Sequence, residues 1–250
     1  MECKLQRVKQ EARGHPQCPK TFDNLANIPD KFKLTYHEKP FLIANVKTPA
    51  GWIIIYGSKE GLKMMSRGEI WTMDGTFSVV PKPFTQLYSF MSEIEGYSYP
   101  CIFCLLPDKK GPSYKIVMET LRDKLAEKGP INLKQAVLDF ESPALKEFRA
   151  AFGPQVRVTG CHVHFSRALR RRQGKEGLLS WQKKASFKIF CGCIKGLAFV
   201  PPRMVAEYYQ CLLGPEMDQV IEDLDNDAGF KLEVKDEMKQ NLNRFLEYFK

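Results

Sequence analysis

One acidic residue interrupts a strand-like, aromatic-rich run in the first third of the chain, WTMDGTFSVVPKPFTQL at residues 71–87. In an extended chain alternate side chains share a face, so Asp74 lies with Thr72 and Thr76 on a polar face. The other face of the strand is apolar. Gly75 leaves room for another group to approach, because it has no Cβ. Taken alone, this pattern is typical of a solvated aspartate before a β-bulge.

A second acidic residue stands near the end of another apolar strand pattern. Asp139 follows Ala136, and the strand then runs into a helix pattern. Asp74 and Asp139 are 65 residues apart, enough chain for a crossover that returns the second strand parallel to the first. Neighbouring parallel strands would bring both carboxylates into one site, where their repulsion favours a divalent cation. The two aspartates are therefore predicted to bind metal together.

Four segments in order carry a family resemblance. They are WTMDGTFSVVPKPFTQLY, YPCIFCLLPDKKGPSY, VLDFESPALKEF and GCHVHF. Across roughly residues 20–250, in order and spacing, they resemble the transposase domain of Mutator-like DNA transposons, the MULE domain, a far more specific match than a lone DG or DFE. The resemblance implies a ribonuclease H-like fold and a DDE-type mechanism that uses Mg²⁺ or Mn²⁺. It also implies that Asp74 and Asp139 are the first two members of the catalytic acidic triad.

The order of patterns along the chain agrees with that fold class, an α/β (α+β) protein with a mixed sheet. Three strands are predicted, then a helix, a strand, a helix and a strand, which is the ribonuclease H-like topology. The predicted ranges are strands at 70–80, 85–93 and 99–106, a helix from Ser113 to Gly129, a strand at 136–140, a helix at 143–152 with Ser142 as N-cap, and a strand at 156–159.

A hairpin and a short helix are expected ahead of this core. Two β-rich runs within residues 41–57 flank the turn residues Pro49 and Gly51. Ser58 is predicted to cap a helix that Gly68 ends.

The segment GCHVHF ends the last strand and begins a helix. Cys161 and His164 are three residues apart, so on a helix they share a face. Members of the family carry a Cys-x2-His motif here, which implies an active-site pair that positions the substrate phosphate or supports the metal site. The alternative is that both residues cap and pack the helix start. Two ligands leave a tetrahedral site half empty, so zinc is not expected.

Arginine is concentrated immediately after that motif, in SRALRRRQGK at residues 166–175. Its position beside the candidate site predicts contacts with DNA phosphates, which are salt-sensitive and independent of sequence. A solvated helix face is the alternative. The candidate DNA-binding residues are Arg167, Arg170, Arg171, Arg172 and Lys175.

Composition indicates a soluble, intracellular protein with no membrane segment, and the family resemblance implies that it acts on DNA in the nucleus. The formal net charge of +9 favours a polyanionic partner, here transposon ends or target DNA. Eight cysteines are too few for a disulfide framework in 250 residues. Cys101, Cys104 and Cys211 are predicted to be reduced and buried. No run of about 18 apolar residues spans a bilayer, and the N-terminus lacks the apolar core of a signal peptide. Homo-oligomerisation stays open.

We expect four parts: a flexible arm at 1–20, a leading hairpin and short helix at 21–68, a catalytic core at 69–177 and a helical insertion at 178–250. Within the arm, His15 and Cys18 lack a second ligand pair. Helix patterns in the insertion cover residues 181–190, 202–213, 215–224 and 235–249.

The third acidic residue of the family lies on a helix entered through an asparagine-rich segment, which this sequence lacks. Glu207, Glu222 and Glu247 lie on apolar-periodic helices, but none is in a matching motif. We expect a core that is incomplete at its C-terminus, as in a fragment, unless one of these glutamates has taken over. One rival function is that of an inactive derivative that binds nucleic acid. The other is an RNA-directed nuclease, but the sequence shows no motif that would recognise the 2′-hydroxyl of RNA.

Overall fold

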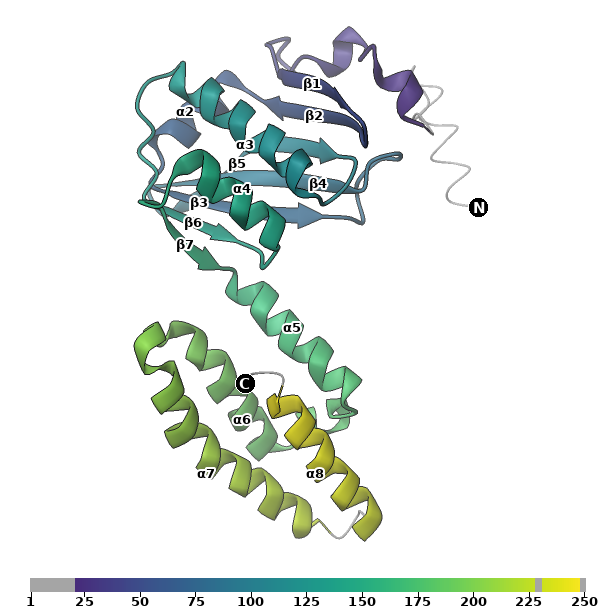
Figure 1. The fold of residues 1–250 in the computed structure, drawn as a ribbon, viewed down its shortest axis with the longest axis vertical. Helices are drawn as coiled ribbons and strands as arrows, with labels where there is room; N and C mark the ends of the chain where they lie inside the picture. The colour runs from purple at the N-terminus through teal and green to yellow at the C-terminus, as the bar shows by residue number, and fades with distance from the viewer. Residues whose placement is uncertain (1–20, 228–230, 248–250) are drawn as a thin grey trace. The chain divides into compact units, whose positions relative to one another are not determined.

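The computed structural model describes residues 21–227 and 231–247, and it divides the chain into two compact units, Met1–Gly160 and Cys161–Lys250. We call their described residues the sheet unit and the helical unit (Figure 1). The predicted arm at 1–20, with His15 and Cys18, lies outside the described residues. Across the described residues there are seven strands and seven α-helices.

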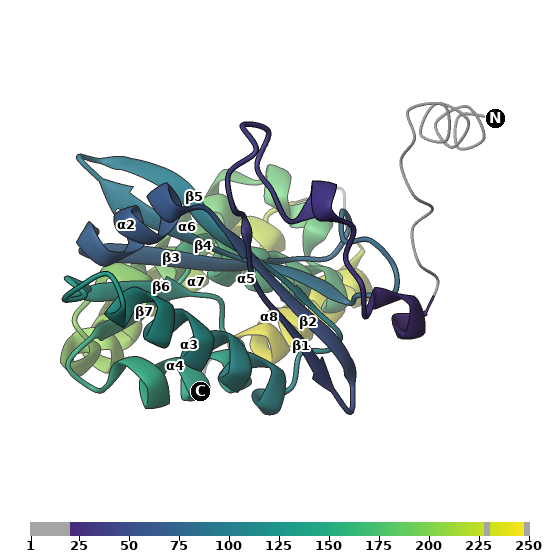
Figure 2. The ribbon, with the colours of Figure 1, turned by 90° about the horizontal axis from the view of Figure 1, so that it is seen from above.

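A seven-stranded mixed sheet forms the sheet unit, with the spatial order β1-β2-β5-β4-β3-β6-β7 (Figures 1 and 2). Neighbours from β1 to β3 pair antiparallel, whereas β6 is parallel to β3 and β7 is parallel to β6. The strands are β1 Leu42–Thr48, β2 Gly51–Gly57, β3 Ile70–Thr76, β4 Gln86–Ile94, β5 Tyr97–Leu106, β6 Gln135–Leu138 and β7 Arg157–Gly160. The predicted leading hairpin is confirmed as β1–β2, and it extends the sheet by pairing with β5.

Three helices of the sheet unit contribute to one apolar core: α2 Lys59–Arg67, α3 Gly111–Ala126 and α4 Ser142–Phe152. The predicted Ser58 cap is confirmed, because its hydroxyl accepts a hydrogen bond from the Gly61 amide at 2.9 Å. Figure 1 shows α3 and α4 lying across the same face of the sheet.

Aromatic side chains dominate that core. Trp71 is fully buried, donates from Nε1 to the Met65 carbonyl at 3.0 Å and meets the Phe152 ring edge-on at 5.1 Å. Phe148 stacks on Phe152 with ring centroids 5.0 Å apart. Burial of one such side chain stabilises the fold by about 1.5–3 kcal/mol. A smaller cluster around Ile28, Ile54 and Phe84 also packs within the sheet unit.

Three sequence predictions are wrong in detail. The first strand ends at Thr76 instead of residue 80, because the chain turns at Ser78 and Val79, ahead of Pro81 and Pro83. Ser142 is the first helical residue of α4 and not its cap, which is Glu141. Cys211 is exposed, whereas Cys101 and Cys104 are buried as predicted.

The helical unit consists of α5 His162–Lys175, α6 Ala185–Gly196, α7 Val205–Asp225 and α8 Leu232–Glu247. Short 3-10 segments separate some of them, at Leu179–Lys183, Leu197–Phe199 and Pro202–Met204. By its contacts α5 groups with this unit, whereas the division made from sequence places residues 161–177 with the core.

The two helices predicted on either side of Pro215 form a single helix, α7, so that prediction is wrong. A proline inside a helix removes one N–H donor and disfavours the turn before it. Tyr209 and Met217, on the two sides of Pro215, both pack against the same apolar cluster. That shared burial keeps the two halves in one helix.

Within the described residues, no helix is long and apolar enough to cross a lipid bilayer.

Phe148→Ala should lower the free energy of unfolding of the sheet unit by about 3–5 kcal/mol, because it leaves a cavity beside Phe152. Urea denaturation followed by circular dichroism measures this. The control is Tyr97→Ala, since Tyr97 is 70% exposed and its truncation should change stability by no more than about 0.5 kcal/mol. Equal losses in the two variants would contradict the assigned core.

Candidate functional site

The pairing of β3 with β6 places the two predicted metal ligands level with each other. In the parallel ladder Ile70 faces Gln135 and Thr72 faces Val137, an offset of 65 residues. The same offset relates Asp74 to Asp139, two positions further along. Neighbouring strands lie about 4.8 Å apart, so level residues on them are close neighbours. The predicted parallel return of the second strand is confirmed.

Both aspartates also fall on the same face of the sheet. On β3, Trp71 and Met73 point into the helix-covered core, so Asp74 points to the opposite face. On β6, Leu138 is in that core, so Asp139 follows with the opposite orientation. Both side chains are half-buried. β3 pairs regularly with β4 through Thr76, so no bulge follows Asp74.

Hydrogen bonds fix the backbone around each aspartate. The Ser89 hydroxyl donates to the Asp74 carbonyl at 3.3 Å, across the β3–β4 pair. The Asp139 carboxylate accepts from the Phe140 amide at 2.7 Å, which orients it as the chain leaves β6. Carboxylate oxygens are the ligands that Mg²⁺ and Mn²⁺ prefer. The donor set therefore fits a hard divalent cation, with water and substrate oxygens completing its coordination.

A buried polar network at the same end of the sheet escaped the sequence analysis. Tyr114 on α3 is fully buried, and its hydroxyl hydrogen-bonds to the Glu141 carboxylate and to Gln86 Oε1, the latter at 3.0 Å. Lys109 forms an ion pair with Glu141 and lies 3.8 Å from the centre of the Phe77 ring. Glu141 is the third residue of the sequence Asp139-Phe140-Glu141. Its contact with Tyr114 arises only in the tertiary fold and has no local signal in the sequence. The network holds the segment that follows Asp139.

The pKa of the Tyr114 hydroxyl is raised well above its ordinary value of 10. Burial is the main cause, followed by the hydrogen bond to Glu141 and the charge of that carboxylate. The pKa of Tyr88, which stands beside Gly75 on β4, is also raised, first by burial, then by Tyr114 and Glu141, and to a smaller extent by Asp139. Both tyrosines therefore stay protonated in the folded protein at neutral pH.

The group that approaches Gly75 is the side chain of Gln86. A Cβ added at Gly75 would stand 2.0 Å from Gln86 Nε2, so any larger residue here would force the buried Gln86 side chain to shift. Gln86 is fully buried, and its Nε2 has no hydrogen-bond partner among the residues that the structure describes. An unsatisfied buried amide of this kind costs about 1–3 kcal/mol.

Cys161 and His164 begin the helical unit. Cys161 is the N-cap residue of α5, and its carbonyl accepts from the Phe165 amide at 3.0 Å. Its side chain makes no capping hydrogen bond. His164 lies in the first turn of α5 and is half-buried. The neighbouring His162 instead packs against Phe199, with ring centroids 4.7 Å apart.

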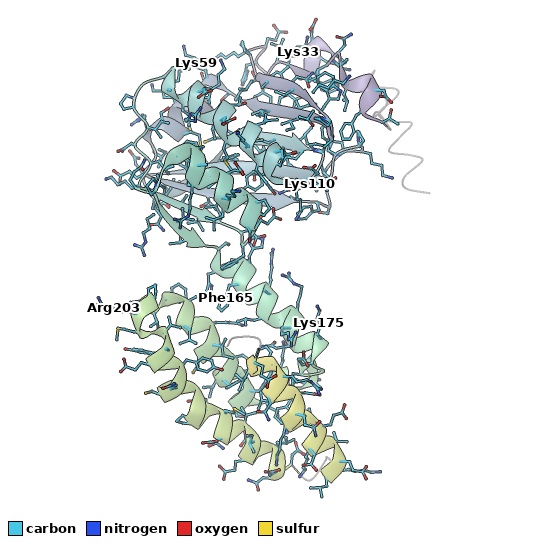
Figure 3. The ribbon with its side chains drawn as sticks, viewed as in Figure 1. Lys33, Lys59, Lys110, Phe165, Lys175 and Arg203 are labelled. Atoms are coloured by element: carbon cyan, nitrogen blue, oxygen red, sulfur yellow. The ribbon has the colours of Figure 1, made fainter. Side chains whose placement is uncertain are left out.

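The predicted DNA-binding cluster lies on α5 and divides into two sets. Arg167, Arg170, Arg171 and Lys175 are exposed, and Figure 3 labels Lys175 near the end of the helix. Arg172 points elsewhere: it forms an ion pair with Glu176 at 2.9 Å and donates to the Arg244 carbonyl on α8 at 3.4 Å. It thereby ties α5 to α8.

The three alternative glutamates are far apart in the helical unit. Glu207 and Glu222 are exposed on α7, and Glu247 is exposed at the end of α8. Among the described residues, no group of three His, Cys, Asp or Glu side chains is arranged to hold a metal ion. No family model matches the chain, and no curated protein does.

Gly75→Ala should destabilise the protein by about 1–3 kcal/mol, because the added methyl group must displace Gln86 from the network. Gly192→Ala is the control: it lies inside α6, a Cβ there meets nothing within 4 Å, and alanine should stabilise the helix by about 0.5–1 kcal/mol. Thermal unfolding of both variants measures the difference. A neutral Gly75→Ala would mean that Gln86 is not packed on Gly75.

The raised pKa of Tyr114 predicts loss of stability in alkali. Its contribution is complete below pH 10, the pKa of the unfolded state, and is lost as the pH rises above 10 toward the folded pKa. Tyr114→Phe should cost about 1–3 kcal/mol at pH 8, since Glu141 and Gln86 lose the hydroxyl as a hydrogen-bond partner, and should show a smaller further loss at pH 11. Urea midpoints at the two pH values measure this. An equal alkaline loss in the wild type and the variant would exclude Tyr114 as its source.

Proposed function

We propose that the protein is a Mutator-like DDE transposase, or a protein derived from one, that binds DNA in the nucleus and transfers phosphoryl groups with a divalent cation. The observation that carries this proposal is the parallel register of β3 and β6, which, continued two residues past its last pair, sets Asp139, the residue after β6, level with Asp74. Two level carboxylates on one face are what a cation site for phosphoryl transfer requires.

The strand arrangement supports a ribonuclease H-like core. Without the leading hairpin, the sheet reads β5-β4-β3-β6-β7. In chain order these are the third, second, first, fourth and fifth core strands, with a helix before and after β6. This order agrees with the one expected of a ribonuclease H-like core, and it sets β3, which carries Asp74, beside β6, which leads into Asp139.

Asp74 and Asp139 would hold Mg²⁺ or Mn²⁺, which activates water or a DNA 3′-hydroxyl and stabilises the leaving oxygen when it is bound. The chain's own contribution is to fix the two carboxylates. The Phe140 amide orients Asp139, and Glu141 anchors the following turn through Tyr114 and Lys109. α3 and α4 both begin at this end, where helix N-termini favour negatively charged phosphate.

Cys161 and His164 follow directly from β7. The last residue of that strand, Gly160, pairs with Leu138, the residue before Asp139. The sheet unit therefore ends beside the proposed metal ligands. The proposed roles of His164 near the scissile phosphate and of Cys161 in positioning it rest on the Cys-x2-His motif of the family that the sequence resembles.

A second candidate function is nucleic-acid binding without chemistry. The specific observation that favours it is the exposed basic set on α5, which needs no metal to bind phosphates. Metal binding distinguishes the two candidates.

The wild type should bind Mg²⁺ or Mn²⁺ in calorimetry, and Asp74→Asn and Asp139→Asn should each weaken that binding by about tenfold or more, since each removes one charged ligand. The asparagine variants keep the side-chain shape, so the fold is retained. Asp123→Asn, on the exposed side of α3, is the charge-matched control and should bind metal as the wild type does.

Absence of metal binding in the wild type would exclude the transposase reaction for this chain. Loss of binding in only one aspartate variant would exclude a shared site. Where binding is lost in both, nicking of supercoiled plasmid DNA with Mn²⁺ tests the chemistry, and the same two variants should be inactive.

A further inference from the structure

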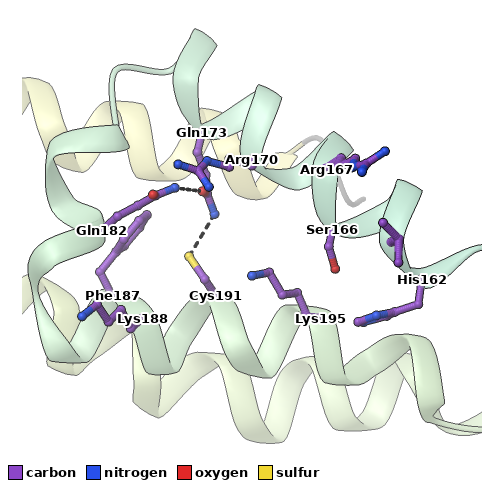
Figure 4. Close-up of a pocket in the computed structure, with 11 residues that line it drawn as sticks. His162, Ser166, Arg167, Arg170, Gln173, Gln182, Phe187, Lys188, Cys191 and Lys195 are labelled. Atoms are coloured by element: carbon purple, nitrogen blue, oxygen red, sulfur yellow. Dashed lines mark hydrogen bonds between the residues drawn. The ribbon is translucent and has the colours of Figure 1, made fainter. Parts of the chain in front are cut away.

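A cavity of about 570 Å³ lies within the helical unit, between α5 and α6 (Figure 4). Figure 4 shows Ser166 and Gln173 on α5 pointing toward α6, and Cys191 and Lys195 on α6 pointing back toward α5. The cavity is thus built by two helices that come together in the tertiary fold.

Four of the side chains that line the cavity carry a positive charge, and none is an Asp or Glu. They are Arg167, Arg170, Lys188 and Lys195. Among the described residues, none of these four has an ion-pair partner, unlike Arg172, Lys184 and Lys239 nearby. Concentrated positive charge without a neighbouring carboxylate is a repulsive arrangement that an anionic ligand would relieve.

A fixed polar wall completes the cavity. Gln182 donates to Gln173 Oε1 at 2.8 Å, and Gln173 donates to Cys191 Sγ at 3.0 Å. Burial raises the pKa of the Cys191 thiol to about 12, although Lys195 acts in the opposite direction, so the thiol is neutral at physiological pH. His162, at the other end, has a buried Nε2 without a hydrogen-bond partner among the described residues.

The charged surface continues beyond this cavity along α5. A second hollow of about 400 Å³ is lined by Arg167, Arg170 and Arg171, together with Gly174 and Leu179. Arg167 and Arg170 therefore border both hollows. α5 has 14 residues and is about 21 Å long, which matches several successive phosphates of a nucleic-acid strand better than one compact anion.

We propose that the cavity between α5 and α6 binds the phosphodiester backbone of a nucleic-acid strand, and that Lys188 and Lys195 on α6 share the phosphates with Arg167 and Arg170 on α5. The choice of ligand rests on the proposed function, but the binding needs no metal. The cavity adds a second helix to the basic set predicted from sequence.

Fluorescence anisotropy of a labelled 20-nucleotide DNA strand, in EDTA and over a range of salt concentrations, tests this proposal. Each phosphate contact to a single strand contributes about 0.7 to the slope of log affinity against log salt concentration. The double variant Lys188→Gln/Lys195→Gln, the cavity variant, should therefore make the slope less steep by about 1.4. It should also weaken binding roughly 25-fold at about 0.1 M salt.

Lys183→Gln/Lys146→Gln removes the same total charge and is the matched control. Both lysines are exposed, and neither lines the cavity. This variant should keep the wild-type slope. Circular dichroism should show unchanged helix content in both variants, since all four lysines project from helices that the substitutions do not break.

Equal slopes in the cavity variant and the control would overturn the proposal. The proposal would also be overturned by a second result. In that result the wild type binds a free nucleoside triphosphate tightly but binds the DNA strand with the same affinity as the cavity variant. An RNA strand of the same sequence provides a further test. If it binds with the same salt slope, and if the cavity variant loses the same amount of affinity for it, the result would support recognition of the phosphodiester backbone.

The test is independent of the metal site. Asp74→Asn and Asp139→Asn should bind the strand normally in EDTA. If the protein binds no metal but its DNA binding depends on Lys188 and Lys195, the proposed reaction is excluded and this inference stands. If the protein binds metal but the cavity variant binds the DNA strand as tightly as the wild type, this inference fails and the proposed reaction stands.

Discussion

Parallel pairing of β3 with β6 is the contact on which the rest of the sheet unit depends. It joins segments 65 residues apart, so its formation requires closure of a long loop that contains β4, β5 and α3. Once formed, it sets the side on which α4 packs and the register at which Asp139 meets Asp74. β7 then adds to β6, and the chain leaves the sheet at Gly160. A shift of one residue in this pairing would turn Asp139 into the core.

The end of the sheet that carries the aspartates is also the end where buried polar groups gather. Gln86, Tyr114 and Glu141 are packed at the start of α3 and α4, and the Tyr114 hydroxyl is within hydrogen-bond distance of both Glu141 and Gln86. Such a network stabilises only when all its members are present, because an isolated buried polar group is costly. It makes the turn after Asp139 rigid, and rigid ligands bind metal with less loss of entropy.

Periodicity in the sequence was sufficient for most elements of the fold. The alternation around Asp74 and the helical spacing from Tyr114 to Leu125 each gave the right element, and the separation of the aspartates gave a parallel return. The errors lie where tertiary packing decides: Pro215 stays within α7 because both flanks are buried in one cluster. The Glu141 network and the two α6 lysines had no local signal, because their partners are on other elements.

The two aspartates and the apolar core lie on opposite faces of this sheet. Trp71 and Met73 alternate with Asp74, so the face that folds the protein is not the face that carries the carboxylates. A substitution at either aspartate therefore leaves the apolar packing of the sheet and the basic helix α5 in place. Under the proposed function, a lineage that lost the reaction by one base change would keep a folded chain with a basic surface, available to selection for a new task.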